Sequence, residues 1–168
     1  MRPPLSALVF LIALVLGLGV IFWLGAGLPD RVATHFNAAG QADGWMPRGE
    51  AIKSFALFAA GISLLTPVLM FCIRFLPARL LNVPRKEYWT RPENYRAACV
   101  FLFRSSLWFA TLGVIFATGS FVLLVQANQS LQAVLNNAGL LALTALYLGG
   151  LLAWIVWLVV YFTRERKA

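Results

Sequence analysis

The residues best suited to chemistry lie in one short segment between the first two apolar runs of the chain. The sequence has a single histidine, His35, and Asn37 and Asp43 follow within eight residues of it. An imidazole, a carboxamide and a carboxylate at this spacing can hydrogen-bond a ligand, coordinate a metal ion or move a proton. A zinc ion would need three or four nitrogen or sulfur ligands, whereas Cys72 and Cys99 lie near the ends of two other apolar runs. We therefore predict that His35 organises its loop through hydrogen bonds, with direct ligand contact as the alternative.

The apolar runs themselves offer little chemistry. None of them contains Asp, Glu, Lys or His, and Arg74 and Arg104 lie at run ends. Ion-coupled transporters, proton pumps and aspartyl or metal intramembrane proteases keep ionisable groups at membrane depth. The serine and threonine hydroxyls in the runs have no base beside them, so we expect them to bond to their own helix backbones. The sequence thus predicts a protein that is not an enzyme and that holds no metal and no cofactor.

The composition identifies the solvent in which this chain folds. The 168 residues are 61% hydrophobic and only 12% charged, whereas a soluble domain is about half apolar and about a quarter charged. A transmembrane helix needs about 20 apolar residues, and four runs are long enough. These runs are residues 5–28, 54–76, 105–125 and 139–162. We predict an all-α membrane protein, a four-transmembrane-helix bundle that forms one integral membrane domain over residues 1–168.

The basic residues predict how the chain is oriented. The net charge of +8 does not indicate a nucleic-acid partner, because the basic residues flank the apolar runs instead of forming one patch. Placing both termini and loop 77–104, together with the helix end that carries Arg74, in the cytoplasm leaves 11 Lys and Arg inside and three outside. Cytoplasmic loops carry the excess of Lys and Arg, so loop 29–53 faces outward. The first run exceeds the roughly 7–15 apolar residues of a signal peptide, so we expect it to be retained.

The outward loop 29–53 has the pattern of a small hairpin. Val32, Thr34 and Phe36 alternate as in a strand, residues 37–40 predict a turn, and Asp43-Gly44 predicts a second turn. Such a hairpin would form a structured cap, with Phe36 and Trp45 at the level of the lipid headgroups. The candidate ligand-binding or partner-binding residues of this loop are His35, Phe36, Asn37, Gly40, Asp43, Gly44 and Trp45.

The cytoplasmic loop 77–104 is basic and aromatic. Thr90 and Glu93 have the spacing of a capping box, which predicts that the third helix begins near Arg91. We expect the aromatic residues to lie in the interfacial belt and the basic ones on anionic lipid, with a cytoplasmic partner as the alternative. The candidate anchor or partner residues are Asn82, Pro84, Tyr88, Trp89 and Arg96.

Small residues at helical spacing predict close packing between helices. Gly113 and Ala117 lie four apart in the third span, and Ala145, Gly149 and Ala153 lie four apart in the fourth. In lipid such residues let helix backbones approach each other, which predicts packing within the bundle, with a homodimer seam as the alternative. Pro67 removes one backbone donor from the second span and predicts a kink there.

Two sets of residues in these loops resemble a known family. The first set is Leu28-Pro29, His35-Phe36-Asn37, Gly40 and Asp43-Gly44-Trp45, and the second is Asn82, Pro84 and Tyr88-Trp89. They resemble the bacterial multi-pass membrane proteins of unknown function that share the N-terminal domain of SdpI-type immunity proteins. The resemblance implies a bacterial inner-membrane protein whose outward loop is functional. It further implies immunity to a secreted peptide and inward signalling, and it supplies no catalytic residues.

The sequence therefore predicts a membrane-embedded binding or sensing protein of an immunity or signalling kind. Loop 29–53 would recognise a peptide, a lipid or a protein partner, and membrane lipids surround the spans. One alternative is an accessory structural subunit of a larger membrane complex. A second alternative is a small transporter or a lipid-handling protein.

Overall fold

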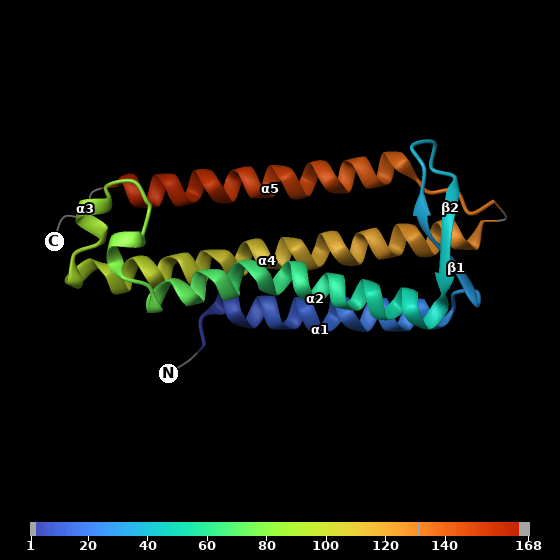
Figure 1. Ribbon diagram of the computed structural model, residues 1–168, viewed down its shortest axis with the longest axis horizontal. Coiled ribbons are helices and arrows are strands. Elements are labelled where there is room, and N and C mark those ends of the chain that lie inside the picture. The colour runs from blue at the N-terminus through green and yellow to red at the C-terminus, as the bar shows by residue number, and fades with distance from the viewer. Residues whose placement is uncertain (1–2, 131, 165–168) are drawn as a thin grey trace.

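The computed structural model describes residues 3–130 and 132–164 as a bundle of long helices with a β-hairpin at one end (Figure 1). The elements in chain order are α1 (Leu5–Ala26), β1 (Arg31–Phe36), β2 (Ala42–Pro47), α2 (Arg48–Cys72), η1 (Ile73–Phe75), η2 (Ala78–Leu80), α3 (Lys86–Trp89), α4 (Pro92–Gln129) and α5 (Asn137–Thr163). In the described residues, four helices are long and apolar enough to cross a membrane: α1, α2 continued by η1, α4 and α5. The predicted four-span helical fold is confirmed.

The bundle has two different ends, which we name by their contents. The hairpin end holds β1, β2 and residues 132–136, and the basic end holds η1, η2, α3 and the first turns of α4 (Figure 1). Helix α4 joins the two ends. Its 38 residues span about 57 Å, well beyond the roughly 30 Å of a hydrocarbon core. Helix α4 is therefore long enough to extend past the lipid and to support segments outside it.

Helices α1, α2 and α4 form the core of the bundle. Ala59, Ala117 and Phe121 are at most 2% exposed in this core. A Cβ built on Gly113 would lie 3.4 Å from Ser63 Oγ, so α2 and α4 are in close contact at this point. The predicted packing role of Gly113 and Ala117 is confirmed, because small side chains at these two positions allow the helices to approach.

Helix α5 lies along α4, apart from α1 and α2 (Figure 1). Of its described residues only Phe162 is buried. The small residues Ala145, Gly149 and Ala153 are not buried, so the expectation that they pack within the bundle is wrong. The reason is that α5 packs chiefly against one neighbouring helix, and its small-residue stripe does not face that helix.

The structure tests the predicted start of the third helix and the capping box predicted there. Helix α4 begins at Pro92, as expected, but Thr90 caps nothing in it. The Thr90 hydroxyl instead donates to the Lys86 carbonyl at 2.9 Å, so the predicted capping box is wrong. The physical reason is that Thr90 ends the short helix α3, and Pro92 starts α4 without needing a cap for its missing N–H. Helix α2 continues through Pro67, which is buried.

Candidate functional site

The hairpin is a pair of antiparallel strands whose first strand is buried where it meets the helices. Val32 and Ala33 are fully buried, and Met46 packs against the same core cluster. Ala33 pairs with Trp45 across the strands, and His35 pairs with Gly44 after a register shift. The predicted strand and the predicted hairpin are confirmed. Adjacent strand residues point to opposite faces, so both faces of β1 are covered at Val32 and Ala33.

The second turn predicted at Asp43-Gly44 is wrong, because both residues belong to β2. A close contact between the strands, and not a turn, requires glycine at position 44. A Cβ on Gly44 would lie 2.9 Å from the Cβ of His35, closer than real side chains come. The glycine therefore allows the strand carrying His35 to lie against β2 at the irregular part of the ladder.

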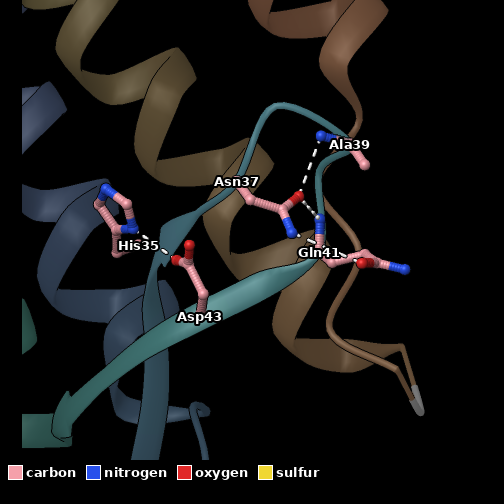
Figure 2. A network of polar contacts seen from close by, with 5 residues as sticks. All are labelled: His35, Asn37, Ala39, Gln41 and Asp43. Carbon is pink, nitrogen blue, oxygen red and sulfur yellow. Dashed lines mark hydrogen bonds and ion pairs between the residues drawn. The ribbon is translucent and has the colours of Figure 1, made fainter.

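The turn at residues 37–40 is built by the side chain of Asn37 (Figure 2). Its Oδ1 accepts hydrogen bonds from the backbone amides of Ala39 at 2.9 Å and Gln41 at 3.0 Å. Gly40 has a φ of +80°, which favours glycine, and its amide donates to the Asn37 carbonyl at 2.8 Å. The predicted turn is confirmed. Because Asn37 is used to hold the turn, its side-chain oxygen is already engaged within the loop.

His35 and Asp43 form a pair on the outer side of the hairpin (Figure 2). His35 Nδ1 lies 2.5 Å from Asp43 Oδ1, and the two side chains are 76% and 44% exposed. A carboxylate on Nδ1 favours the tautomer with the proton on that nitrogen, so Nε2 is presented as an acceptor when the ring is neutral. His35 thus makes the loop hydrogen bond that we predicted, and it also offers a ring nitrogen to solvent.

Three contacts tie the hairpin to the helices and to the loop before α5. Asn128 near the end of α4 donates to the Ala33 carbonyl at 2.9 Å and accepts from the Ala33 amide at 2.8 Å. The Leu135 amide donates to the Gly40 carbonyl at 2.8 Å. Asn137 Nδ2 donates to the Ala38 carbonyl at 3.1 Å. The hairpin is therefore fixed to α4 and α5 as well as to its own flanking helices.

Arg48 fixes the base of the hairpin. Its Nη1 donates to the Leu28 carbonyl at 2.9 Å, and its Nη2 lies 3.2 Å from Asp30 Oδ1. The Arg48 amide also donates to the Asp30 carbonyl at 2.9 Å. These bonds join the chain entering β1 to the first turn of α2, so the two strands leave the bundle at a defined angle.

The predicted residues of the outer loop separate into two groups. Gly40 is buried, Phe36 and Gly44 are half-buried, and Asn37 is engaged in the turn. His35, Asp43 and Trp45 have exposed side chains, and Trp45 is 50% exposed. The first group shapes the hairpin, while the second forms its outer surface. We call His35, Asp43 and Trp45 the outer surface from here on.

The basic end is held by aromatic side chains. Trp89 is 1% exposed, and its Nε1 donates to the Phe162 carbonyl at 2.9 Å in the last turn of α5. The Tyr95 hydroxyl lies 2.8 Å from the Ile73 carbonyl in η1 and 2.9 Å from the Leu76 carbonyl just after η1. Carbonyls at a helix end have no partner within the helix, so a side-chain donor satisfies them. The prediction that Trp89 lies in a lipid-facing belt is wrong for this reason.

The other predicted residues of the basic end lie nearer the surface. Tyr88 is half-buried and packs edge-on against Trp89, with ring centroids 5.0 Å apart. Asn82 and Pro84 are exposed and line an apolar cavity of about 340 Å³ between the ends of α2 and α5. Arg96 is exposed and lines a different cavity. Across residues 3–130 and 132–164, no group of three His, Cys, Asp or Glu side chains is placed to hold a metal ion.

Comparisons with known proteins identify one matching segment. A family profile described as Domain of unknown function (DUF1648) matches residues 10–60. The matched segment contains most of α1, the whole hairpin and the first half of α2. Searches of curated proteins and of solved structures gave no significant match.

Proposed function

We propose that this chain is a membrane-embedded binding or sensing protein whose hairpin end recognises a peptide or protein partner. One observation carries the proposal: the hairpin is fixed by bonds to α4, to residue 135 and to α5, yet its outer surface is exposed. A surface that is already ordered loses little conformational entropy when a partner binds. Trp45 supplies apolar area, while His35 and Asp43 supply oriented polar groups.

The hairpin end faces away from the cytoplasm in this proposal. Three basic residues lie at or beside it, namely Arg31, Arg48 and Lys53. The basic end and the two chain termini carry the other 11. This asymmetry supports an inner-membrane protein with cytoplasmic termini. The partner would then reach the hairpin from the outer side of that membrane.

The resemblance to SdpI-type immunity proteins makes a peptide the first partner to test. Most of the residues that carry it lie in the hairpin, and the family profile matches the same segment. The proposed role is recognition and signalling, without catalysis. The apolar runs 5–28, 54–76, 105–125 and 139–162 carry no Asp, Glu, Lys or His, and the outer surface contains one histidine–carboxylate pair.

The test compares the full chain in lipid nanodiscs with a variant that lacks the outer surface, His35→Ala/Asp43→Ala/Trp45→Ala. The matched control is Leu57→Ala, at an exposed apolar position on α2 that faces lipid in this proposal. Each is incubated with the secreted and envelope peptides of the source cells, and retained molecules are identified by mass spectrometry. We expect at least one molecule that the parent and the control retain and the triple variant loses. Retention of the same set by all three proteins would refute the proposed recognition role.

A structural subunit of a larger complex is the second candidate, and α5 is the observation that favours it. This helix has a single buried residue among those described, Phe162, and a stripe of small residues that the bundle leaves uncovered. Small residues four apart suit close contact with another transmembrane helix. Purification in mild detergent separates the candidates, because a structural subunit would carry a larger protein in fixed ratio and would lose it in Gly149→Leu.

A further inference from the structure

An apolar cavity lies between α1, α2 and α4 in the part of the bundle that is long and apolar enough to cross a membrane. It has a volume of about 390 Å³, and its lining includes Phe10, Leu64, Pro67, Phe71, Phe103 and Leu107. Every residue that the structure places on its wall is apolar. A cavity of this kind in a membrane-spanning region suits a hydrocarbon chain, since no polar group on its wall would be left without a partner.

A basic cavity follows the apolar one toward the basic end. It has a volume of about 310 Å³, and its lining residues are Arg74, Tyr95, Arg96, Cys99 and Val100. None of these lining residues carries a carboxylate. This cavity lies where α2 and η1 end and α4 has just begun, so it coincides with the level expected for lipid headgroups.

Helical spacing places the two cavities along the same seam. Along α2 and η1, residues 64, 67 and 71 line the apolar cavity and residue 74 lines the basic one. Along α4, residues 107 and 103 line the apolar cavity, and residues 100 and 96 line the basic one. Steps of three and four residues keep side chains on one face of a helix. The two cavities therefore follow one another along the α2–α4 face, and we call the pair the groove.

Arg74 lies at the boundary between the two parts. The centre of its guanidinium group lies 3.7 Å from the centroid of the Phe71 ring, and its Nε donates to the Phe71 carbonyl at 3.2 Å. Phe71 in turn contacts Phe103 edge-on, with centroids 5.6 Å apart. Among the residues that the structure describes, neither Arg74 nor Arg96 forms an ion pair with a carboxylate. Both cations are thus available to an anion at the end of an apolar groove.

We propose that this groove binds one anionic phospholipid, independently of the recognition role of the hairpin. The phosphate lies between Arg74 and Arg96, and an acyl chain lies along Phe71, Phe103 and Pro67. Arginine binds phosphate through paired N–H donors, and basic pockets between transmembrane helices bind anionic headgroups. The apolar cavity beside the two arginines makes the occupant a lipid and not a free phosphate. Under the proposed orientation, this lipid belongs to the cytoplasmic leaflet.

The test measures lipid retention by the delipidated full chain with native mass spectrometry. Phosphatidylglycerol and phosphatidylcholine with the same acyl chains are offered in equal amounts. We expect the parent to retain one phosphatidylglycerol in preference to phosphatidylcholine. Each arginine near an anionic headgroup contributes about a factor of five in affinity, so Arg74→Gln/Arg96→Gln should lose about twenty-fivefold. The matched control Arg79→Gln/Arg91→Gln removes two exposed arginines of the same end that line neither part of the groove, and it should keep the preference.

Two further measurements distinguish a bound phospholipid from a free phosphate and from a loose association with the surface. Val68→Trp fills the apolar part and leaves the charge unchanged, so it should weaken retention of phosphatidylglycerol while circular dichroism remains that of the parent. Glycerol phosphate, which has the anionic group without the chains, should not displace the lipid. Equal losses in the double variant and in its control would mean diffuse charge attraction and would overturn the proposal. Displacement by glycerol phosphate would overturn it as well.

Discussion

The two ends of this bundle are held together by different kinds of contact. At the hairpin end, hydrogen bonds from side-chain amides and backbone groups fix the hairpin to the helices, as in the paired bonds between Asn128 and Ala33. At the basic end, buried aromatic residues join the helix ends, as in the hydrogen bond from Trp89 to the last turn of α5. Small polar contacts leave the outer side chains of the hairpin exposed, whereas the aromatic contacts remove Trp89 from the surface.

This difference separates two loops that look alike in the sequence. Both are short and polar, both contain aromatic residues, and both contain candidate binding residues. In the structure, the hairpin presents an ordered polar surface, and the loop at the basic end acts as a clamp on α2 and α5. The expected effects of substitution on stability therefore differ strongly between the ends.

The largest expected loss of stability is at the basic end, for Trp89→Ala. The change removes a fully buried ring and leaves the Phe162 carbonyl without its donor. Large aromatic-to-alanine changes in a core cost about 3–5 kcal/mol. Chemical unfolding in detergent, followed by circular dichroism, measures the loss. Trp23→Ala is the control, because that ring is 77% exposed and should cost far less. Equal losses for the two tryptophans would contradict the clamp.

The next largest effect is expected at the hairpin turn, for Gly40→Ala. A Cβ at this position would lie 2.8 Å from the Leu135 carbonyl oxygen, and the φ of +80° disfavours a side chain. The strain should cost at least about 2 kcal/mol and separate the turn from residue 135. The same unfolding assay measures it. Gly49→Ala is the control, since no atom lies within 4 Å of its added Cβ. If the two glycine variants were equally stable, the hairpin would not be held against residue 135.

A smaller effect is expected for Asn128→Leu, which removes both bonds to Ala33. Two lost hydrogen bonds predict about 1–2 kcal/mol, or roughly a tenfold increase in local opening of β1. Trypsin cleavage after Arg31 reports that opening, because the bond lies in the strand. Gln126→Leu changes an exposed neighbour of similar size and should leave the cleavage rate unchanged. Unchanged cleavage in Asn128→Leu would show that Asn128 does not hold the hairpin.

The smallest effect on stability is expected on the outer surface. His35→Ala removes a side chain that is 76% exposed and Trp45→Ala one that is 50% exposed, so each should change the free energy of unfolding by less than about 1 kcal/mol. The same chemical unfolding assay measures both variants. A loss above about 1 kcal/mol in either one would mean that the side chain is structural. The outer surface would then be part of the hairpin's support and not a surface left for binding.

The spans and the hairpin could be predicted from the sequence, because both depend on local patterns of residue type. Apolar length indicates a span, and the alternation at Val32 with the turn at Asn37 indicates a hairpin. The bond from Asn128 to Ala33 joins residues 95 apart, and nothing in the local pattern of either residue indicates it. The one local signal was that Asn128 is a polar residue just beyond the predicted span 105–125.

The same limit explains the errors at the basic end and in α5. A tryptophan next to tyrosine and arginine suits a lipid interface as well as a protein interior, so local composition cannot place Trp89. Helix α5 is apolar on all sides, and its pattern does not reveal how many neighbours it has. Gly44 was assigned to a turn because Asp-Gly often forms one, and its contact with His35 appears only once the strands are paired.

Amide hydrogen exchange on the full chain in nanodiscs tests the central claim most directly, namely that the hairpin is ordered before any partner binds. The amides of Ala33, Asn37, Gln41 and Arg48 all donate to groups within the fold. We predict that they exchange far more slowly than in an unstructured peptide of the same sequence, with rates close to those at the end of α4. Exchange at the rate of the free peptide would show a hairpin that is ordered only on binding, and the preformed recognition surface would be contradicted.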